Sequence, residues 1–512
     1  MQAKQAHAAK QQAQRRARAE ATARQLQMTP HPESSDALTA PAGTSANASL
    51  SEQEILRRGL NESVTNNTIK ATGGEFRNYR ELAWIVDHSS LSFDEVHQAL
   101  KTRMAKLQQS DPPLKRYERV YRRSKVTRRQ IADFLWHYYE HSMPSKMGYC
   151  TVRSGGDTLK LSVLTKPEWL DLNVHLGGDN ERFLLSSGDS PGATPKLVDG
   201  PLDAAIQRLA EAELDGTRFF GTPSYRLLDF LLSDGGLQAE FAVTDSANYI
   251  FTLDLLEAEL LETLASGEPA IGKGGPLFPL RDHYLPNIDT ILDFDNRTCL
   301  GGPLALFAAA RPGTRRAPNT PDFTLLVQER SAQVMNMTGR LAVIPKCFHE
   351  PLASRTEDVP LSASLERELE EELLGRPELE NSPTHPVRKV DPMHLNEISA
   401  PMRWLEEHRG TDSYRVECVG FGINAVSGNY EFPCIIVIDD DEWWGKFGGH
   451  VEGNWEVNRI RQYSSRDREG ISALLKDSAW SNEGLFAFSA GLRRLAAVGG
   501  SRVDVPDVEL EA

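Results

Sequence analysis

The sequence predicts a mixed α/β protein built from several domains. Segments with the apolar pattern of strands recur from Tyr149 onward, and amphipathic helical segments are interspersed among them. The part of the chain before residue 146 instead carries helix-capping signatures followed by helical apolar stripes. A chain of 512 residues is long enough for about two to four domains. We therefore expect a C-terminal α/β/α sandwich, preceded by a helical domain and an α+β domain.

The first 145 residues divide into an arm, a linker and a helical domain. Residues 1–50 are rich in Ala, Gln and Arg and then in Ser, Thr and Pro, with too few apolar side chains to form a core, so a disordered basic arm and linker are expected. Within residues 51–145, the pairs Ser92/Glu95 and Thr127/Gln130 each have the spacing of a capping box and each precedes a helical apolar stripe. The two helices expected around 79–107 could form a helix-turn-helix.

Two further domains are expected after the helical one. In residues 146–320, two strands joined by a Gly-Gly-Asp turn are followed by two amphipathic helices. Residues 321–500 alternate strands with helices, which is typical of a sheet covered by helices. The predicted strands span 149–154, 158–165, 323–330, 340–348, 414–426 and 432–440, and the predicted helices span 201–214, 252–267, 471–480 and 486–498.

Composition excludes several classes of protein. A run of about 18 or more apolar residues, the minimum for a membrane-spanning helix, does not occur, and the first residues lack the apolar core of a secretory signal. The five cysteines are widely spaced and form no CxxC or Cys/His cluster, which argues against structural zinc and disulfides. Reduced thiols fit a cytoplasmic protein best. The net charge of −15 argues against a surface that is basic all over.

One acidic segment, "SLERELEEELLGR" at 364–376, carries the strongest functional signal. In a helix, spacings of three and four residues bring side chains together, so Glu368, Glu371 and Glu372 should share one face. The leucines of the segment lie on a neighbouring arc that can face a core. Three converging carboxylates repel one another unless a cation neutralises them, and Mg²⁺ (or Mn²⁺) is a hard ion that prefers oxygen ligands. The alternative is an acidic helix that is simply solvated.

The central part of this segment resembles the Nudix signature. That signature reads Gly, five residues, Glu, seven residues, and then Arg-Glu-apolar-any-Glu-Glu-any-Gly-apolar, and residues 367–372, "RELEEE", match its central part at every defined position. The resemblance implies that Glu368, Glu371 and Glu372 hold magnesium and that Glu368 or a nearby carboxylate activates water. Arg367 is the second expected catalytic residue and could brace a carboxylate from the neighbouring turn. Nudix proteins cleave nucleoside diphosphates linked to another group, so a nucleotide-type ligand is implied.

The signature is incomplete outside this central part. Its upstream Gly and Glu positions are occupied by Ala353 and Val359, and its later Gly position by Leu374. More broadly, residues from "LAVIPKCFHEPL" to "WSNEGLFAF" resemble a family of large actinobacterial proteins with a degenerate Nudix-like region, described as transcriptional regulators or as uncharacterised. That resemblance implies no catalytic residues.

A second signal is the basic stretch from Lys101 to Arg129. It precedes a helical segment rich in aromatic residues, and Lys125, Arg128 and Arg129 could contact nucleic-acid phosphates near the N-terminus of that helix. The alternative is an amphipathic helix with aromatic core residues and solvated cations.

Two functional hypotheses follow from these two signals. The first is a Nudix-like protein that binds, and in its active form hydrolyses, a nucleoside diphosphate derivative with magnesium. The second is a DNA-binding transcriptional regulator whose degenerate Nudix-like domain senses a ligand or is purely structural.

Overall fold

The computed structural model describes the chain from Phe76 to its C-terminus with several gaps. All described residues belong to one compact unit, Asn61–Ala512. The arm and linker predicted for residues 1–50 lie outside the described residues. The described ranges are 76–110, 113–186, 195–217, 219, 222–233, 236–267, 278–313, 320–330, 339–352, 354–374, 393, 397–448, 451, 453 and 457–512.

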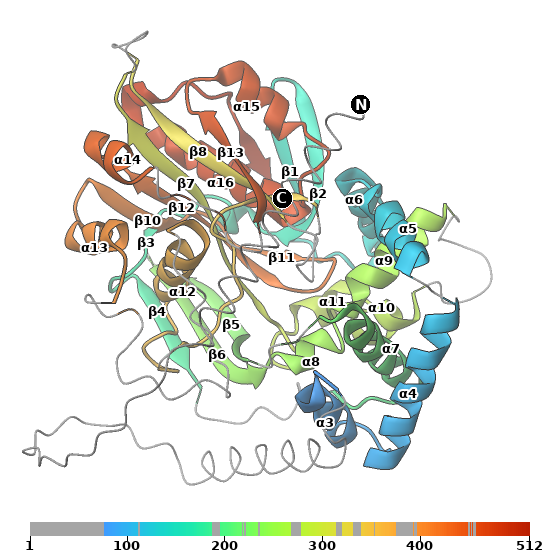
Figure 1. The fold of residues 1–512 in the computed structure, drawn as a ribbon. Helices are drawn as coiled ribbons and strands as arrows, with labels where there is room; N and C mark the ends of the chain where they lie inside the picture. The colour runs from blue at the N-terminus through green and yellow to red at the C-terminus, as the bar shows by residue number, and fades with distance from the viewer. Residues whose placement is uncertain are drawn as a thin grey trace, which may run out of the picture. The chain divides into compact units, whose positions relative to one another are not determined.

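A sheet of eleven strands organises most of the unit (Figure 1). Its main path runs β13-β8-β7-β12-β11-β2-β1-β14, while β10 and β3 branch from β12, and β9 pairs with β8. Neighbours are antiparallel except β7 and β12, which run parallel. The strands are β1 Gly148–Ser154, β2 Asp157–Thr165, β3 Val174–His175, β7 Gly301–Arg311, β8 Asp322–Arg330, β9 Leu341–Val343, β10 Tyr414–Cys418, β11 Gly422–Asn424, β12 Tyr430–Ile438, β13 Val457–Ser464 and β14 Glu509–Glu511.

Helices cover both faces of this sheet, because its central strands are apolar on both sides. On β7, Leu304 and Leu306 pack in the core beneath α15 (Arg468–Leu475) and α16 (Asn482–Val498), whereas Phe307 faces the opposite core. That opposite core also contains residues of α12 (Leu361–Glu368), α13 (Ala400–Glu407) and α14 (Asp441–Phe447). The result is a helix–sheet–helix arrangement, so the predicted mixed α/β class is confirmed.

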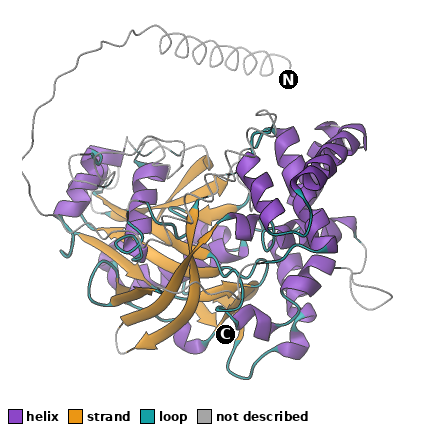
Figure 2. Ribbon diagram, turned by 90° about the horizontal axis from the view of Figure 1, so that it is seen from below, coloured by secondary structure: helices purple, strands orange, loops and turns teal. Residues whose placement is uncertain are grey.

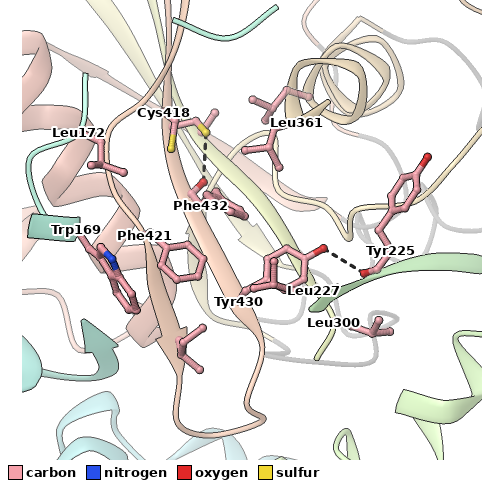
Figure 3. Packing of buried hydrophobic residues seen from close by; sticks show 14 of the residues in the cluster. Trp169, Leu172, Tyr225, Leu227, Leu300, Leu361, Cys418, Phe421, Tyr430 and Phe432 are labelled. Atoms are coloured by element: carbon pink, nitrogen blue, oxygen red, sulfur yellow. Dashed lines mark hydrogen bonds between the residues drawn. The ribbon is translucent and has the colours of Figure 1, made fainter. Parts of the chain in front are cut away.

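A three-stranded sheet packs against the same side of the large sheet as α12. It has the order β4-β6-β5 and consists of β4 Glu181–Leu185, β5 Pro223–Ser233 and β6 Gly236–Asp245. Figure 3 shows Tyr225 and Leu227 of β5 among Phe421, Tyr430 and Phe432 from the β11–β12 region. The hydroxyl of Tyr430 donates a hydrogen bond to the carbonyl of Tyr225 at 3.2 Å, which satisfies a polar group inside this apolar core.

Most of the helices from α3 to α11 gather to one side of the strands (Figure 1), and Figure 2 shows a group of helices beside the strands. Both predicted capping boxes form, between Ser92 and Glu95 and between Thr127 and Gln130. The basic stretch contains a helix that the sequence analysis did not delimit, α5. These helices are α3 Tyr79–Asp87, α4 Phe93–Ser110, α5 Pro113–Ser124, α6 Arg128–Tyr138, α7 Asp199–Asp215, α8 Ala247–Ile250, α9 Leu255–Ser266, α10 Pro279–Tyr284 and α11 Ile288–Leu292.

The boundary placed at residue 320 falls between β7 and β8, which pair with each other in the large sheet. Strands from residues 146–320 and from residues 321–512 therefore alternate within one sheet. In the described part of the chain, every helix is too short or too polar to cross a lipid bilayer.

Candidate functional site

The acidic segment folds as α12 followed directly by a π-helical turn, η4 (Leu369–Leu373). Four leucines at spacings of four, Leu361, Leu365, Leu369 and Leu373, are fully buried beneath the large sheet. Their burial fixes the rotation of the helix. Short π-helical turns are rare and occur often at functional sites, because they change which side chains share a face.

The acidic residues of this segment are buried rather than solvated. Glu370 and Glu372 have no exposed surface, Glu366 and Glu371 are 8% exposed, and the side chain of Glu368 is 16% exposed. A buried carboxylate is stable only when cations or hydrogen-bond donors compensate for the lost water. The solvated acidic helix considered above is therefore not what the structure has.

Arg367 supplies much of this compensation. Its Nη1 donates to the carbonyl of Glu350 at 3.0 Å, and its Nη2 lies 3.3 Å from Oε1 of Glu368. Burial alone would lower the pKa of the Arg367 guanidinium, but the charges of Glu368, Glu350 and Glu371 raise that pKa above its usual value. The guanidinium is thus the cation around which these acids gather.

The remaining acids of the segment hold neighbouring loops and helices. Glu370 accepts hydrogen bonds from the backbone N–H of Ser399, at 2.6 Å, and from its hydroxyl, at 2.7 Å, just before α13. Glu372 accepts from the backbone N–H of Lys346 at 3.1 Å. Glu366 pairs with Arg409 at 2.6 Å, on another side of the helix.

The donor set does not fit the predicted Mg²⁺ or Mn²⁺. Glu368 and Glu371 lie beside the guanidinium of Arg367, and Glu372 is turned to the Lys346 amide. Each of the three carboxylates has at least one further interaction in the structure. Across the described ranges, no group of three or more His, Cys, Asp or Glu side chains is arranged to hold a metal ion. Arg367 supplies positive charge to Glu368 and Glu371.

Sequence reasoning missed a second buried ionic cluster nearby. Lys346 lies 2.6 Å from Glu483, in the first turn of α16, and Glu431 of β12 lies close to both. Burial raises the pKa of Glu431 to about 8, which the charge of Lys346 only partly opposes. Burial also acts to raise the pKa of Glu483, but the charge of Lys346 outweighs this effect, so the pKa of Glu483 is lowered. A lone acid inside the apolar run "YEFPCIIVI" was the available signal.

The three basic residues predicted to bind nucleic acid are not equivalent. Lys125 is exposed, with its Nζ 4.5 Å from the centre of the Tyr121 ring, and the side chain of Arg129 is 83% exposed. The structure corrects the prediction that Arg128 contacts phosphates, because Arg128 is only 5% exposed and donates a hydrogen bond to the carbonyl of Lys160 at 3.0 Å. Burial, followed by the nearby charge of Arg340, lowers the pKa of Arg128 to about 10.

Helix α5 presents a surface that combines basic and apolar side chains. Val120 and Tyr121 are about half exposed, which is unusual for large apolar residues in this chain, and Lys115 and Arg122 are also exposed. Some arginines of α5 attach it to the rest of the molecule: Arg119 pairs with Glu211 of α7, and Arg122 and Arg123 both pair with Glu262 of α9, at 3.4 and 2.7 Å. We call Lys115, Tyr121 and Arg122 of α5, Lys125, which follows α5, and Arg129 of α6 the α5 basic surface.

Searches for relatives give no family for this chain: no protein-family model matches it, and no curated protein matches its sequence.

Proposed function

We propose that this protein binds nucleic acid through the α5 basic surface, and that its Nudix-like acidic helix is a structural element rather than a hydrolytic centre. The single observation that carries the proposal is that the basic stretch has a solvated side, on which exposed cations flank an exposed tyrosine. Cations spaced along a helix meet phosphates, and an exposed aromatic ring can stack on bases or sugars. DNA is the expected partner, and the five free cysteines favour a cytoplasmic location.

The structural role of the acidic helix follows from Arg367. A hydrolytic Nudix helix needs carboxylates that are open to a metal ion and to the phosphates of a substrate. Here the same carboxylates compensate a buried guanidinium and donors from neighbouring segments. These contacts support a helix that organises the core around it.

Binding of a labelled DNA duplex, followed by fluorescence anisotropy at several salt concentrations, tests the proposal. We expect affinity to fall steeply with salt, because counterions are released when cations meet phosphates. The substitutions Lys125→Gln and Arg129→Gln should each weaken binding and reduce the salt slope by about one. Arg128 is not a suitable test, since its buried guanidinium supports the fold.

The matched control is Lys446→Gln. Lys446 is exposed and its Nζ also lies over an aromatic ring, that of Phe447, at 4.9 Å, so it resembles Lys125 in all but location. Binding should be unchanged in this variant. Salt-independent binding, or equal losses in the Lys446 and Lys125 variants, would contradict the proposal.

Hydrolysis of nucleoside diphosphate derivatives remains the competing hypothesis, because Glu350, Glu368 and Glu371 do gather at one place. Incubating the protein with a panel of such compounds and Mg²⁺ or Mn²⁺ distinguishes a hydrolase from a protein whose acidic helix is only structural. We expect no metal-dependent release of phosphate or nucleoside monophosphate. Turnover that disappears in Glu371→Gln would establish the hydrolase instead.

A further inference from the structure

A cavity lies beside Arg409, which pairs with Glu366 of the acidic helix. It has a volume of about 420 Å³ and opens between the β3–β4 loop and the α13–β10 loop. That volume is within the range of small-molecule sites, roughly 300–1,000 Å³. Its lining mixes polar and apolar surface, and the polar or charged side chains relevant here are His175, Arg409, Asp412, Tyr414 and Arg415.

Two basic side chains of this cavity are held only loosely by their acidic partners. Arg415 pairs with Asp412 at 3.1 Å, but Asp412 is completely solvated, so the pair is weak. His175 lies 3.4 Å from Glu417, and Glu417 is already neutralised by two contacts with Arg494, at 2.5 and 3.1 Å. Both side chains can therefore turn to a ligand without leaving a buried charge unpaired.

Arg409 links the cavity to the acidic helix. Its guanidinium is 35% exposed and contacts Glu366 at 2.6 Å and Glu406 at 2.5 Å. Glu366 is buried, and burial raises its pKa to about 7 although Arg409 opposes that shift; Glu406 and Glu181 raise it further. Glu366 can thus take up a proton near neutral pH, and an incoming anion could then replace it as the partner of Arg409.

Tyr414 provides an independent sign that the cavity can take a ligand. It lines the cavity and is 4% exposed, and its hydroxyl is buried without a hydrogen-bond partner among the described residues. A buried donor of this kind is destabilising unless something accepts its hydrogen bond. The charge of the nearby Glu366 also acts on this hydroxyl, so a ligand that alters the charge of Glu366 would alter the environment of Tyr414 as well.

We propose that this cavity binds a compact anion of the phosphate type, held by Arg409, Arg415 and His175. Two guanidinium groups and an imidazole offer more donors than the two oxygens of a carboxylate can accept, whereas a phosphoryl group has three terminal oxygens. The phosphate is either a free ion or part of a nucleotide. The proposal is independent of nucleic-acid binding at the α5 basic surface.

Proton uptake should accompany binding. An anion that engages Arg409 removes the main cation from Glu366, whose other neighbours are Glu406 on α13, Glu181 on β4 and the Tyr414 hydroxyl on β10. None of these neighbours is a cation, so the pKa of Glu366 must rise and the carboxyl becomes protonated. Binding should therefore tighten as the pH falls from about 8 to about 6.

Titration calorimetry of the full chain with inorganic phosphate, pyrophosphate, ADP and adenosine tests the proposal. Saturable binding of at least one phosphate compound, with none of adenosine, is expected. ADP binding more tightly than pyrophosphate would identify a nucleotide, and the reverse a free anion. The buffer dependence of the heat at pH 7 reports the proton taken up.

The diagnostic variant is Arg415→Gln, which leaves the buried Arg409–Glu366 pair intact. It should weaken binding about tenfold, as expected for loss of a charge-assisted hydrogen bond. The control is Arg153→Gln, because Arg153 forms a similar surface pair with Glu511 at 3.0 Å on β1 and does not line the cavity. Absence of binding, or binding that Arg415→Gln leaves unchanged, overturns the proposal.

Discussion

At the scale of single residues, the acidic helix shows how cations and hydrogen-bond donors of the chain compensate several buried carboxylates. Glu370 relies on the backbone and hydroxyl donors of Ser399, Glu366 on Arg409, and Glu368 on the guanidinium of Arg367. Each of these contacts compensates one carboxylate in a different way. The glutamates of this segment therefore connect the helix to neighbouring segments of the folded chain.

Arg367 should be the most sensitive residue of this helix. Replacing it with Met would keep most of the side-chain volume but leave Glu368, Glu371 and Glu350 near one another without their cation. Removal of one partner of a buried pair costs about 3–5 kcal/mol. Urea unfolding should show a loss of that order for Arg367→Met, whereas Arg153→Met at an exposed pair should change stability by less than about 1 kcal/mol. Similar midpoints for the two variants would disprove the central role of Arg367.

Glu431 gives a prediction about pH. Its pKa in the folded protein, about 8, lies above the value near 4.5 that it has when unfolded, so the folded state binds this proton more tightly. The stability that this difference provides is complete below about pH 4.5 and is lost as the pH rises through 8, at roughly 1.4 kcal/mol per pKa unit at most. We expect Glu431→Gln, which cannot ionise, to raise the urea midpoint relative to the native chain more at pH 8 than at pH 5. An equal difference at both pH values would show that Glu431 is ionised in the folded protein.

At the scale of elements, the sequence predicted helices well from local patterns, but it did not reveal contacts between segments that are distant in the chain. Thr127 and Gln130 identify the start of α6, because a capping box is encoded within four residues. The burial of Arg128 could not be foreseen in the same way, since it depends on the carbonyl of Lys160 in β2. The π-helical turn of the acidic segment likewise changes the geometry that a regular helix would give to Glu372.

The capping box of α6 should contribute measurably to stability. In Thr127→Ala, the N–H of Gln130 loses the hydroxyl that accepts its hydrogen bond, and the side-chain oxygen of Gln130 loses the bond that this hydroxyl donates. Loss of an N-cap costs about 1 kcal/mol. Thr102→Ala, within α4 and exposed, should be neutral or slightly stabilising, because alanine is the better helix former. Chemical denaturation of both variants tests the contrast, and equal effects would mean that the cap is not formed in solution.

At the scale of the whole molecule, the large sheet is the feature that the sequence hides most completely. Strands could be recognised along the chain, but their order could not, because β1 pairs with β14 from the C-terminus and β2 pairs with β11. Such pairings depend on contacts between residues that are hundreds of positions apart. The predicted division at residue 320 separates β7 from β8, which pair with each other in the structure.

This interleaving of strands leads to a prediction about fragments. A fragment covering residues 321–512 would retain β8, β12 and α16 but lose β7, which lies between β8 and β12 and buries Leu304 and Leu306 beneath α16. Without β7, both neighbouring strands would expose unpaired backbone groups along their central edges. We expect this fragment to unfold without cooperativity in urea and to aggregate, whereas residues 76–512 should unfold in a cooperative transition. Because an independent domain carries its own core, a cooperative transition of the 321–512 fragment would show that the boundary at residue 320 is a true one.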